Sequence, residues 1–181
     1  MTKPSRKKHE ARLIELTQQV SQGEEQLGKI TRQAEAARLY LSLIQRRREL
    51  QASMYLFEIE RNTRLASECS EKMRQYGDKN HPEYQSLMLD KAGHDCAIAS
   101  MQESLKMVSK DGVDFAMPAL QYFDKGSAEK EIDALDTQIR QIGAVNLGAI
   151  EQLTTFEAAH SQRKIELSEL NAKMSELANK A

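Results

Sequence analysis

Two cysteines and two histidines are the side chains of this sequence best suited to binding a metal ion. They are Cys69, His81, His94 and Cys96. Their spacing matches no zinc pattern, because the ligands of each half of a zinc site are roughly two to four residues apart. The tripeptide His94-Asp95-Cys96 supplies too few well-placed ligands by itself. We therefore predict a surface loop and a half-buried thiol at these positions, and no metal site.

A basic cluster offers a second kind of chemistry, the binding of nucleic-acid phosphates. Its members are Arg46, Arg47 and Arg48, together with Lys3, Arg6, Lys7 and Lys8. No aromatic residues lie between the basic ones, and the formal net charge of the chain is −1. Three successive arginines also point in different directions around a helix. The three arginines are retained as candidate contacts to DNA phosphates, but we do not expect specific DNA binding by this chain alone.

No set of residues supports enzymatic catalysis. The Gly-x-x-x-x-Gly-Lys-Ser/Thr loop that cradles ATP phosphates is missing from the sequence. No Ser/His/Asp or Cys/His arrangement can be defended. His160 occupies a heptad position, where a polar residue that fixes helix register is a simpler explanation than a base or a ligand. We therefore expect neither an enzyme nor a bound cofactor.

Composition indicates long amphipathic helices that would position these residues. Charged residues make up 29%, apolar residues 40% and aromatic residues 5% of the 181 residues. No apolar run approaches the roughly 18 residues of a membrane helix, and two cysteines without framework spacing fit a reducing cytoplasm. Residues 1–66 carry a net charge of +5 and the remainder −6. The two parts could attract one another as antiparallel partners, although ordinary solvated helix faces explain the same pattern.

Apolar residues repeat in heptads near both ends of the chain, which is typical of coiled coils. The N-terminal seams are Leu13, Val20, Leu27, Ala34 and Leu41, and Leu16, Gly23, Ile30, Ala37 and Ile44. The C-terminal seams are Leu153, His160, Leu167 and Met174, and Phe156, Arg163, Leu170 and Leu177. The register fails at Arg48 and Gln51, and a displaced register follows at Leu50, Met54 and Phe57. Such a displacement changes the local winding or marks a change of partner.

Loop signals divide the sequence between these seams. Gly, Asp, Asn and Pro cluster over residues 76–82 and predict the clearest turn. A second turn is predicted over residues 109–117, with a helix starting at or near Pro118. Ser127 is the predicted N-cap of the helix that runs through residues 132–142.

A last break follows that helix. Gly143 is predicted to end it in the left-handed conformation, and the side chain of Asn146 is predicted to cap the helix after it. The expected fold is all-α: a long antiparallel two-stranded coiled coil, interrupted by a small helical joint module. Residues 1–75 form the N-terminal arm, residues 76–84 a connecting turn, and residues 85–181 the C-terminal arm, with joint breaks over residues 109–149.

Two separate segments resemble the arms of bacterial structural-maintenance-of-chromosomes (SMC) ATPases. Residues 25–60 are similar to the family's N-terminal arm, with Arg32-Gln33-Ala34-Glu35, Tyr40 and Arg48-Glu49-Leu50 filling the pattern. Residues 105–170 are similar to its C-terminal arm, where Val145-Asn146-Leu147 and Ala149-Ile150-Glu151 fit the element written "LGxVNLxAIEE". The two segments occur in the family's order. The resemblance covers roughly two-thirds to three-quarters of the chain and only the arm, because the phosphate loop, the signature motif, the Walker B strand and the hinge are missing.

The resemblance implies the head-proximal interruption of the arm, called the joint, which couples the ATP state of the heads to arm alignment in chromosome organisation and segregation. The implied partners are the arm of a second SMC protomer, kleisin-type ScpA and ScpB, and DNA through the full complex, all at the nucleoid in the cytoplasm and none in a membrane. ATP and Mg²⁺ would bind the head of a full-length parent. The expected structural centre is Gly143, Val145, Asn146 and Ile150, faced by Tyr40, Leu43, Leu50 and Phe57.

Three interpretations stay open at this point. The simplest account of the short connection near residues 76–84 is an excised fragment with its two arm strands joined, and a naturally short SMC-like protein is the other. A free-standing helical coiled-coil adaptor unrelated to SMC proteins would share the heptads but would leave the matches at both ends as coincidence.

Overall fold

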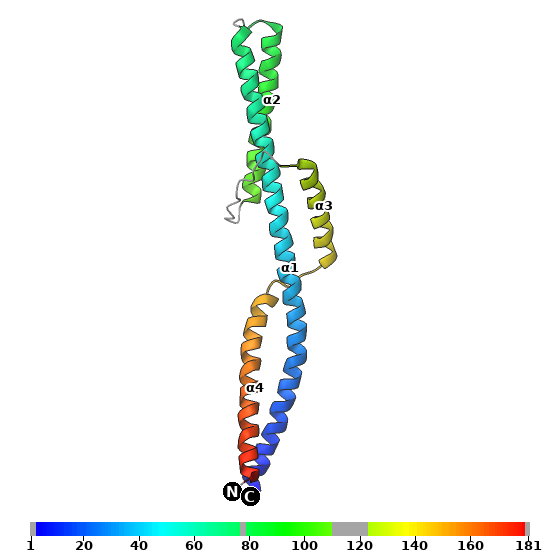
Figure 1. Ribbon diagram of the computed structural model, residues 1–181, viewed down its shortest axis with the longest axis vertical. Coiled ribbons are helices and arrows are strands. Elements are labelled where there is room, and N and C mark those ends of the chain that lie inside the picture. The colour runs from blue at the N-terminus through cyan, green and yellow to red at the C-terminus, as the bar shows by residue number, and fades with distance from the viewer. Residues whose placement is uncertain (1–2, 77–78, 110–122, 180–181) are drawn as a thin grey trace. The chain divides into compact units, whose positions relative to one another are not determined.

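The computed structural model describes residues 3–76, 79–109 and 123–179. These residues form four α-helices and no strand (Figure 1): α1 Lys3–Tyr76, α2 Pro82–Val108, α3 Lys125–Ile142 and α4 Ala149–Asn179. The all-α prediction is therefore confirmed for the described part of the chain. Most of the turn predicted over residues 109–117, and the helix start predicted at Pro118, lie outside the described residues.

The chain divides into two compact units, and α1 contributes to both. Unit 1 comprises residues 1–41 and 142–181, and unit 2 comprises residues 42–141. The helix α1 has no break at residues 48–51, where the heptad register fails. The displaced heptad therefore leaves the helix intact, and in unit 2 it accompanies contact with a different partner, α3.

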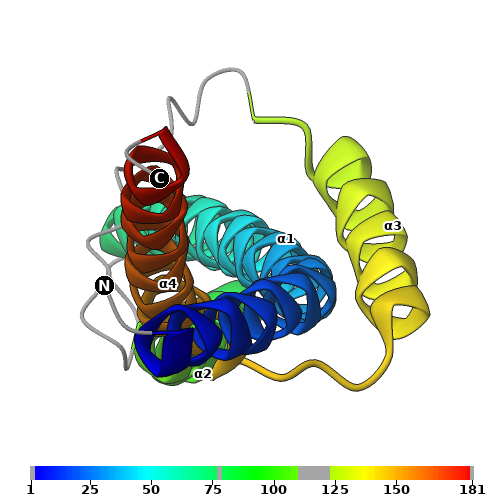
Figure 2. The ribbon, with the colours of Figure 1, turned by 90° about the horizontal axis from the view of Figure 1, so that it is seen from below.

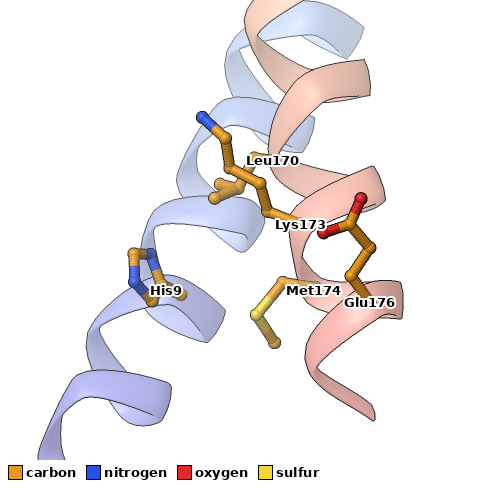
Figure 3. A pocket seen from close by; sticks show the side chains of 5 residues that line it. All are labelled: His9, Leu170, Lys173, Met174 and Glu176. Carbon is orange, nitrogen blue, oxygen red and sulfur yellow. The ribbon is translucent and has the colours of Figure 1, made fainter. Parts of the chain in front are cut away.

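In unit 1, α4 runs antiparallel beside the N-terminal part of α1, as both ribbon views show (Figures 1 and 2). Ala34 packs in one apolar cluster with Ala149 and Leu153, at the beginning of α4. His9 lies in a small groove with Met174, near the end of α4 (Figure 3). Ala34 and Ala149 have no exposed surface. Small side chains at this point let the two helix backbones approach closely.

Most heptad positions of unit 1 face this contact. The buried ones are Leu16, Val20, Gly23, Ala34 and Ala37 on α1, and Leu153 and His160 on α4. The prediction is wrong at Leu41, which is 44% exposed. Because Ala34 already packs against Ala149, the first residue of α4, no part of α4 remains opposite Leu41. Arg163 is also exposed and takes no place in the seam.

In unit 2, the C-terminal part of α1 and α2 form an antiparallel hairpin. The ring of Tyr76, at the end of α1, stacks on His81 with 4.9 Å between centroids. His81 precedes α2, and its Nδ1 accepts a hydrogen bond from the backbone N–H of Glu83 at 3.3 Å. Further along the hairpin, His94 Nδ1 and Asn62 Oδ1 are 2.9 Å apart. Polar contacts therefore fix both the turn and the register of the hairpin.

The helix α3 packs on α1 within the same unit and runs antiparallel to it (Figure 1). Ala128 and Leu135 of α3 form a buried cluster with Leu50 of α1. The partly buried residues packed around this cluster are Leu43, Met54, Phe123 and Ile132. Four-residue and three-residue steps place Ala128, Ile132 and Leu135 on one face of a helix. Burial of each leucine contributes about 1.5–3 kcal/mol to the stability of this contact.

The start of α3 corrects one sequence prediction. Ser127 is not the N-cap, since α3 already begins at Lys125. Asp124 takes that role: its Oδ1 accepts from the N–H of Gly126 at 3.1 Å, and its backbone carbonyl accepts from the N–H of Ala128 at 3.0 Å. Aspartate and serine are comparable N-caps, so residue type alone does not choose between Asp124 and Ser127. Packing of Ala128 against the core fixes the helix start three residues earlier than expected.

Candidate functional site

The break between α3 and α4 lies in unit 1 and is built on Gly143. Its φ is +72°, in the left-handed region. No non-glycine residue among those that the structure describes has a positive φ. The prediction of a left-handed glycine that ends α3 is therefore confirmed, because α3 stops at Ile142. A Cβ at this position would meet nothing within 4 Å. The requirement for glycine is thus one of backbone conformation and not of space.

The start of α4 differs from the prediction for Asn146. The backbone carbonyl of Asn146 accepts a hydrogen bond from the N–H of Ala149 at 3.1 Å. The first intrahelical bond of α4 runs from the N–H of Gln152 to the carbonyl of Gly148 at 3.0 Å, so Gly148 holds the N-cap position. Asn146 is two residues too early to cap α4 with its side chain and instead closes a turn through its backbone.

The other predicted centre residues separate into the two units. Ile150 packs against the Ala34–Ala149–Leu153 cluster of unit 1. Val145 and Tyr40 also belong to unit 1 and are half-buried, but they are not part of that cluster. Leu43 and Leu50 pack with α3 in unit 2. The ring of Phe57 lies 5.4 Å from that of Phe123, the residue just before α3. The predicted set is therefore not one cluster but two packing sites.

A close contact in unit 1 joins Gly23 of α1 to His160 of α4. An ideal Cβ on Gly23 would lie 2.6 Å from His160 Nδ1, closer than such atoms approach in proteins. His160 is 3% exposed, and neither ring nitrogen has a hydrogen-bond partner among the described residues. Its ring is nearly parallel to that of Phe156, at 6.4 Å. The absence of a side chain at Gly23 is what lets the imidazole enter the seam.

A cross-helix ion pair lies beside this contact. Lys164 Nζ of α4 is 2.7 Å from Glu24 Oε1 of α1. The hydrogen bond from Lys164, reinforced by its positive charge, lowers the pKa of the Glu24 carboxyl. Both side chains are more than half exposed, so solvent screens the pair and its contribution to stability is small. The ion pair marks the register of the two helices, because it requires the turn of α4 that holds Lys164 to lie beside Glu24.

Three ion pairs join α1 to α3 in unit 2. Arg46 Nε is 2.9 Å from Glu131 Oε1, and Arg47 Nε is 2.7 Å from Asp136 Oδ1. The third joins Lys125 Nζ to Glu58 Oε1 at 2.7 Å. Sequence reasoning did not find these pairs, because they join residues 67 or more positions apart whose register is set by apolar packing. Two of the three arginines suggested as phosphate contacts are thus bound to carboxylates of the same chain.

These pairs also alter proton affinities. The hydrogen bond from Lys125 to Glu58 raises the pKa of the Lys125 ammonium, and the charge of Glu58 adds to the effect. The Glu131 contact likewise raises the pKa of Arg46. The carboxylate of Glu58 is 15% exposed and its partner 41% exposed. Lys125 therefore keeps its charge over a wider pH range when α3 is packed on α1.

The candidate metal ligands are not brought together. His81 and His94 make the separate contacts of the α1–α2 hairpin described above, and Cys69 and Cys96 are free thiols. Across residues 3–76, 79–109 and 123–179, no group of three or more His, Cys, Asp or Glu side chains could hold a metal ion. Within the same ranges, no helix is long and apolar enough to cross a membrane.

Comparisons of the chain with known protein families, with curated proteins and with solved structures found no match.

Proposed function

We propose that this chain is an arm segment of an SMC chromosome ATPase, containing the joint next to the head. The observation that carries the proposal is the pairing in unit 1. There α1 and α4, which hold parts of the two segments that resemble opposite strands of an SMC arm, run antiparallel with Gly23 against His160. The heptads, the small buried residues and the antiparallel direction fit a two-stranded coiled coil.

The second support is the interruption of that pairing. Gly143 ends α3 with φ +72°, and α4 begins six residues later, at Ala149. In unit 2, α3 packs on the part of α1 where the heptad register is displaced. A continuous two-stranded coiled coil has no need for such a helix. A joint does need one, because a helix such as α3, packed on α1 and followed by the break at Gly143, can change its packing while α1 stays continuous.

The proposed role is mechanical and involves no catalysis by this chain. Engagement of ATP-bound heads would apply force at the head-proximal end of the arm. The glycine break would let that force change the alignment of α3 and α4 without unwinding either helix. In this role the chain would act with a second protomer's arm, with kleisin-type ScpA and ScpB, and with DNA through the complete complex.

A graft tests the proposal. Residues 13–60 and 123–170 replace the corresponding two arm segments of a bacterial SMC protein, and chromosome segregation is scored in cells that depend on the chimera. We expect the chimera to support segregation, and the same chimera with Gly143→Val to fail while its ATPase heads still hydrolyse ATP. The matched control is Gly28→Val, an exposed helical glycine with open space around it. A chimera that is stably expressed but never supports segregation would exclude the joint assignment.

A further inference from the structure

A groove in unit 2 lies where α3 packs on α1. Gln51, Met54 and Tyr55 of α1 form one wall, and Glu129, Ile132 and Asp133 of α3 form the other. Its volume is about 370 Å³, within the range of roughly 300–1,000 Å³ typical of binding pockets in proteins. Met54 and Ile132 also pack against the buried Leu50–Ala128–Leu135 cluster. The floor of the groove is therefore apolar and held in place by the core beneath it.

The rim of the groove is negatively charged. Glu129 and Asp133 are exposed and stand four residues apart, on the same side of α3. Lys125 lies 3.8 Å from Glu129, but its shorter contact, 2.7 Å, is to Glu58. The carboxylate of Asp133 has no ion-pair partner among the residues that the structure describes. Glu129 thus has only a long contact to a lysine that it shares with Glu58, and Asp133 has no basic partner among the described residues.

The remaining two carboxylates of α3 have the basic partners that Asp133 lacks. Glu131 and Asp136 each contact an arginine of α1, at 2.9 and 2.7 Å. Helix α3 therefore already binds basic side chains through acidic residues on its α1-facing side. Asp133 is the acidic residue of this region whose basic partner the described chain does not supply.

We propose that this groove binds a basic segment of a partner protein, through an arginine or lysine next to an apolar residue. The aliphatic stem of such a side chain suits the floor of Met54 and Ile132, and its charged head suits Glu129 and Asp133. Tyr55 adds an aromatic ring, to which guanidinium groups bind favourably. The proposal does not depend on the SMC assignment, since a helical adaptor with the same α1–α3 packing would carry the same groove.

Peptide binding to the full chain tests this inference. The probe is a fluorescent 14-residue helical peptide with arginine and leucine on one face, and its counterpart has glutamate for each arginine. Binding is measured by fluorescence anisotropy. We expect saturable binding of the arginine peptide and none of the glutamate peptide. Glu129→Gln with Asp133→Asn should weaken binding about five- to tenfold, with helix content unchanged.

The matched control also removes two negative charges, but at positions away from the groove. Asp90→Asn with Glu157→Gln changes two exposed carboxylates, one on α2 and one on α4, and should change affinity less than about twofold. Replacement of Glu129 and Asp133 by lysine should reverse the preference toward the glutamate peptide. Equal weakening by both amide pairs, or no saturable binding, would overturn the proposal. So would equally tight binding of spermidine, which would make the groove a site for small cations.

Discussion

At the scale of single residues, the contact of Gly23 with His160 constrains how α4 packs on α1. A glycine costs a helix interior roughly 0.5–1 kcal/mol relative to alanine. Burial of an imidazole without hydrogen-bond partners adds a further cost. Both costs occur at one point of unit 1, where the imidazole occupies the space that a Cβ would fill. The pair therefore favours the one register of α4 on α1 in which the imidazole lies opposite a residue without a side chain.

Replacement of this glycine gives the first prediction. Gly23→Ala should destabilise the chain by about 1–3 kcal/mol, because the new Cβ would lie 2.6 Å from His160 Nδ1. Gly28→Ala is the control: that glycine is also in α1, but no atom lies within 4 Å of its would-be Cβ. It should stabilise the chain by roughly 0.5–1 kcal/mol. Urea unfolding of the two variants measures both values.

A double-mutant cycle then isolates the contact. In the Gly23→Ala background, His160→Ala should cost less than it does in the parent, because it removes the clash. The coupling between the two positions should reach at least about 1 kcal/mol. If Gly23→Ala stabilised the chain as Gly28→Ala does, the two helices would not pair in the register described.

The break at Gly143 gives the second prediction. Gly143→Val should cost at least about 1 kcal/mol, since a β-branched residue is strained at φ +72°. Asn146→Ala should cost less than about 0.5 kcal/mol, because Asn146 acts through its backbone carbonyl, which alanine retains. Thermal unfolding followed by circular dichroism compares them. A Gly143→Val variant as stable as the parent would mean that the left-handed turn is not required.

At the scale of elements, the attachment of α3 rests mainly on apolar packing. Burial of Leu50 and Leu135 contributes a few kcal/mol, roughly 1.5–3 for each leucine. Each partly exposed ion pair to α1 contributes at most about 1 kcal/mol. The leucines therefore supply most of the packing energy and set the register of α3 on α1, and the ion pairs form within that register.

The pH dependence of one of these pairs gives the third prediction. The pKa of Lys125 is raised in the folded chain, so its contribution is complete below the unfolded value of 10.5 and is lost as pH rises through the folded value. The difference in urea midpoint between the parent and Lys125→Gln should therefore be largest below pH 10.5 and should close above it. The same comparison for Lys130→Gln, an exposed lysine of α3, should show no such closure. A difference for Lys125→Gln that stays constant with pH would contradict this origin.

The sequence predicts the helices and their buried faces better than it predicts where the helices begin. The heptads of Leu16, Val20 and Leu153 predict buried seam positions, because local periodicity sets which face a helix buries. The N-caps were predicted at Ser127 and Asn146 but lie at Asp124 and Gly148. Several residues near each end could cap, and only tertiary packing decides among them. The ion pairs and the groove beside Asp133 depend on α3–α1 register, which no local pattern encodes.

At the scale of the whole molecule, the uneven charge of the sequence has a partial structural counterpart. Arg46 and Arg47, in the basic first part of the chain, bind Glu131 and Asp136 in the acidic remainder. Unit 1 shows the reverse polarity, because there the acidic partner, Glu24, lies in the first part and the basic one, Lys164, in the last. The net charge of each part therefore does not dictate the pairing, which follows the apolar seams.

The fourth prediction concerns the purified chain as a whole. It should neither bind nor hydrolyse ATP, since the sequence has no loop that could hold the phosphates. Filter binding and a phosphate-release assay measure the two activities. Hydrolysis that a point substitution in this chain abolishes would replace the mechanical role with an enzymatic one.

The central claim is that one molecule supplies both antiparallel helices of unit 1, and crosslinking tests it most directly. Glu24→Cys and Lys164→Cys, in a chain with Cys69→Ser and Cys96→Ser, are joined by a short bismaleimide. Glu24→Cys with Glu176→Cys is the control, since twelve residues of helix place position 176 roughly 18 Å beyond position 164. We predict a crosslink within monomers for the first pair only, with a yield that does not change on dilution. Crosslinks that form only between molecules and disappear on dilution would contradict the account.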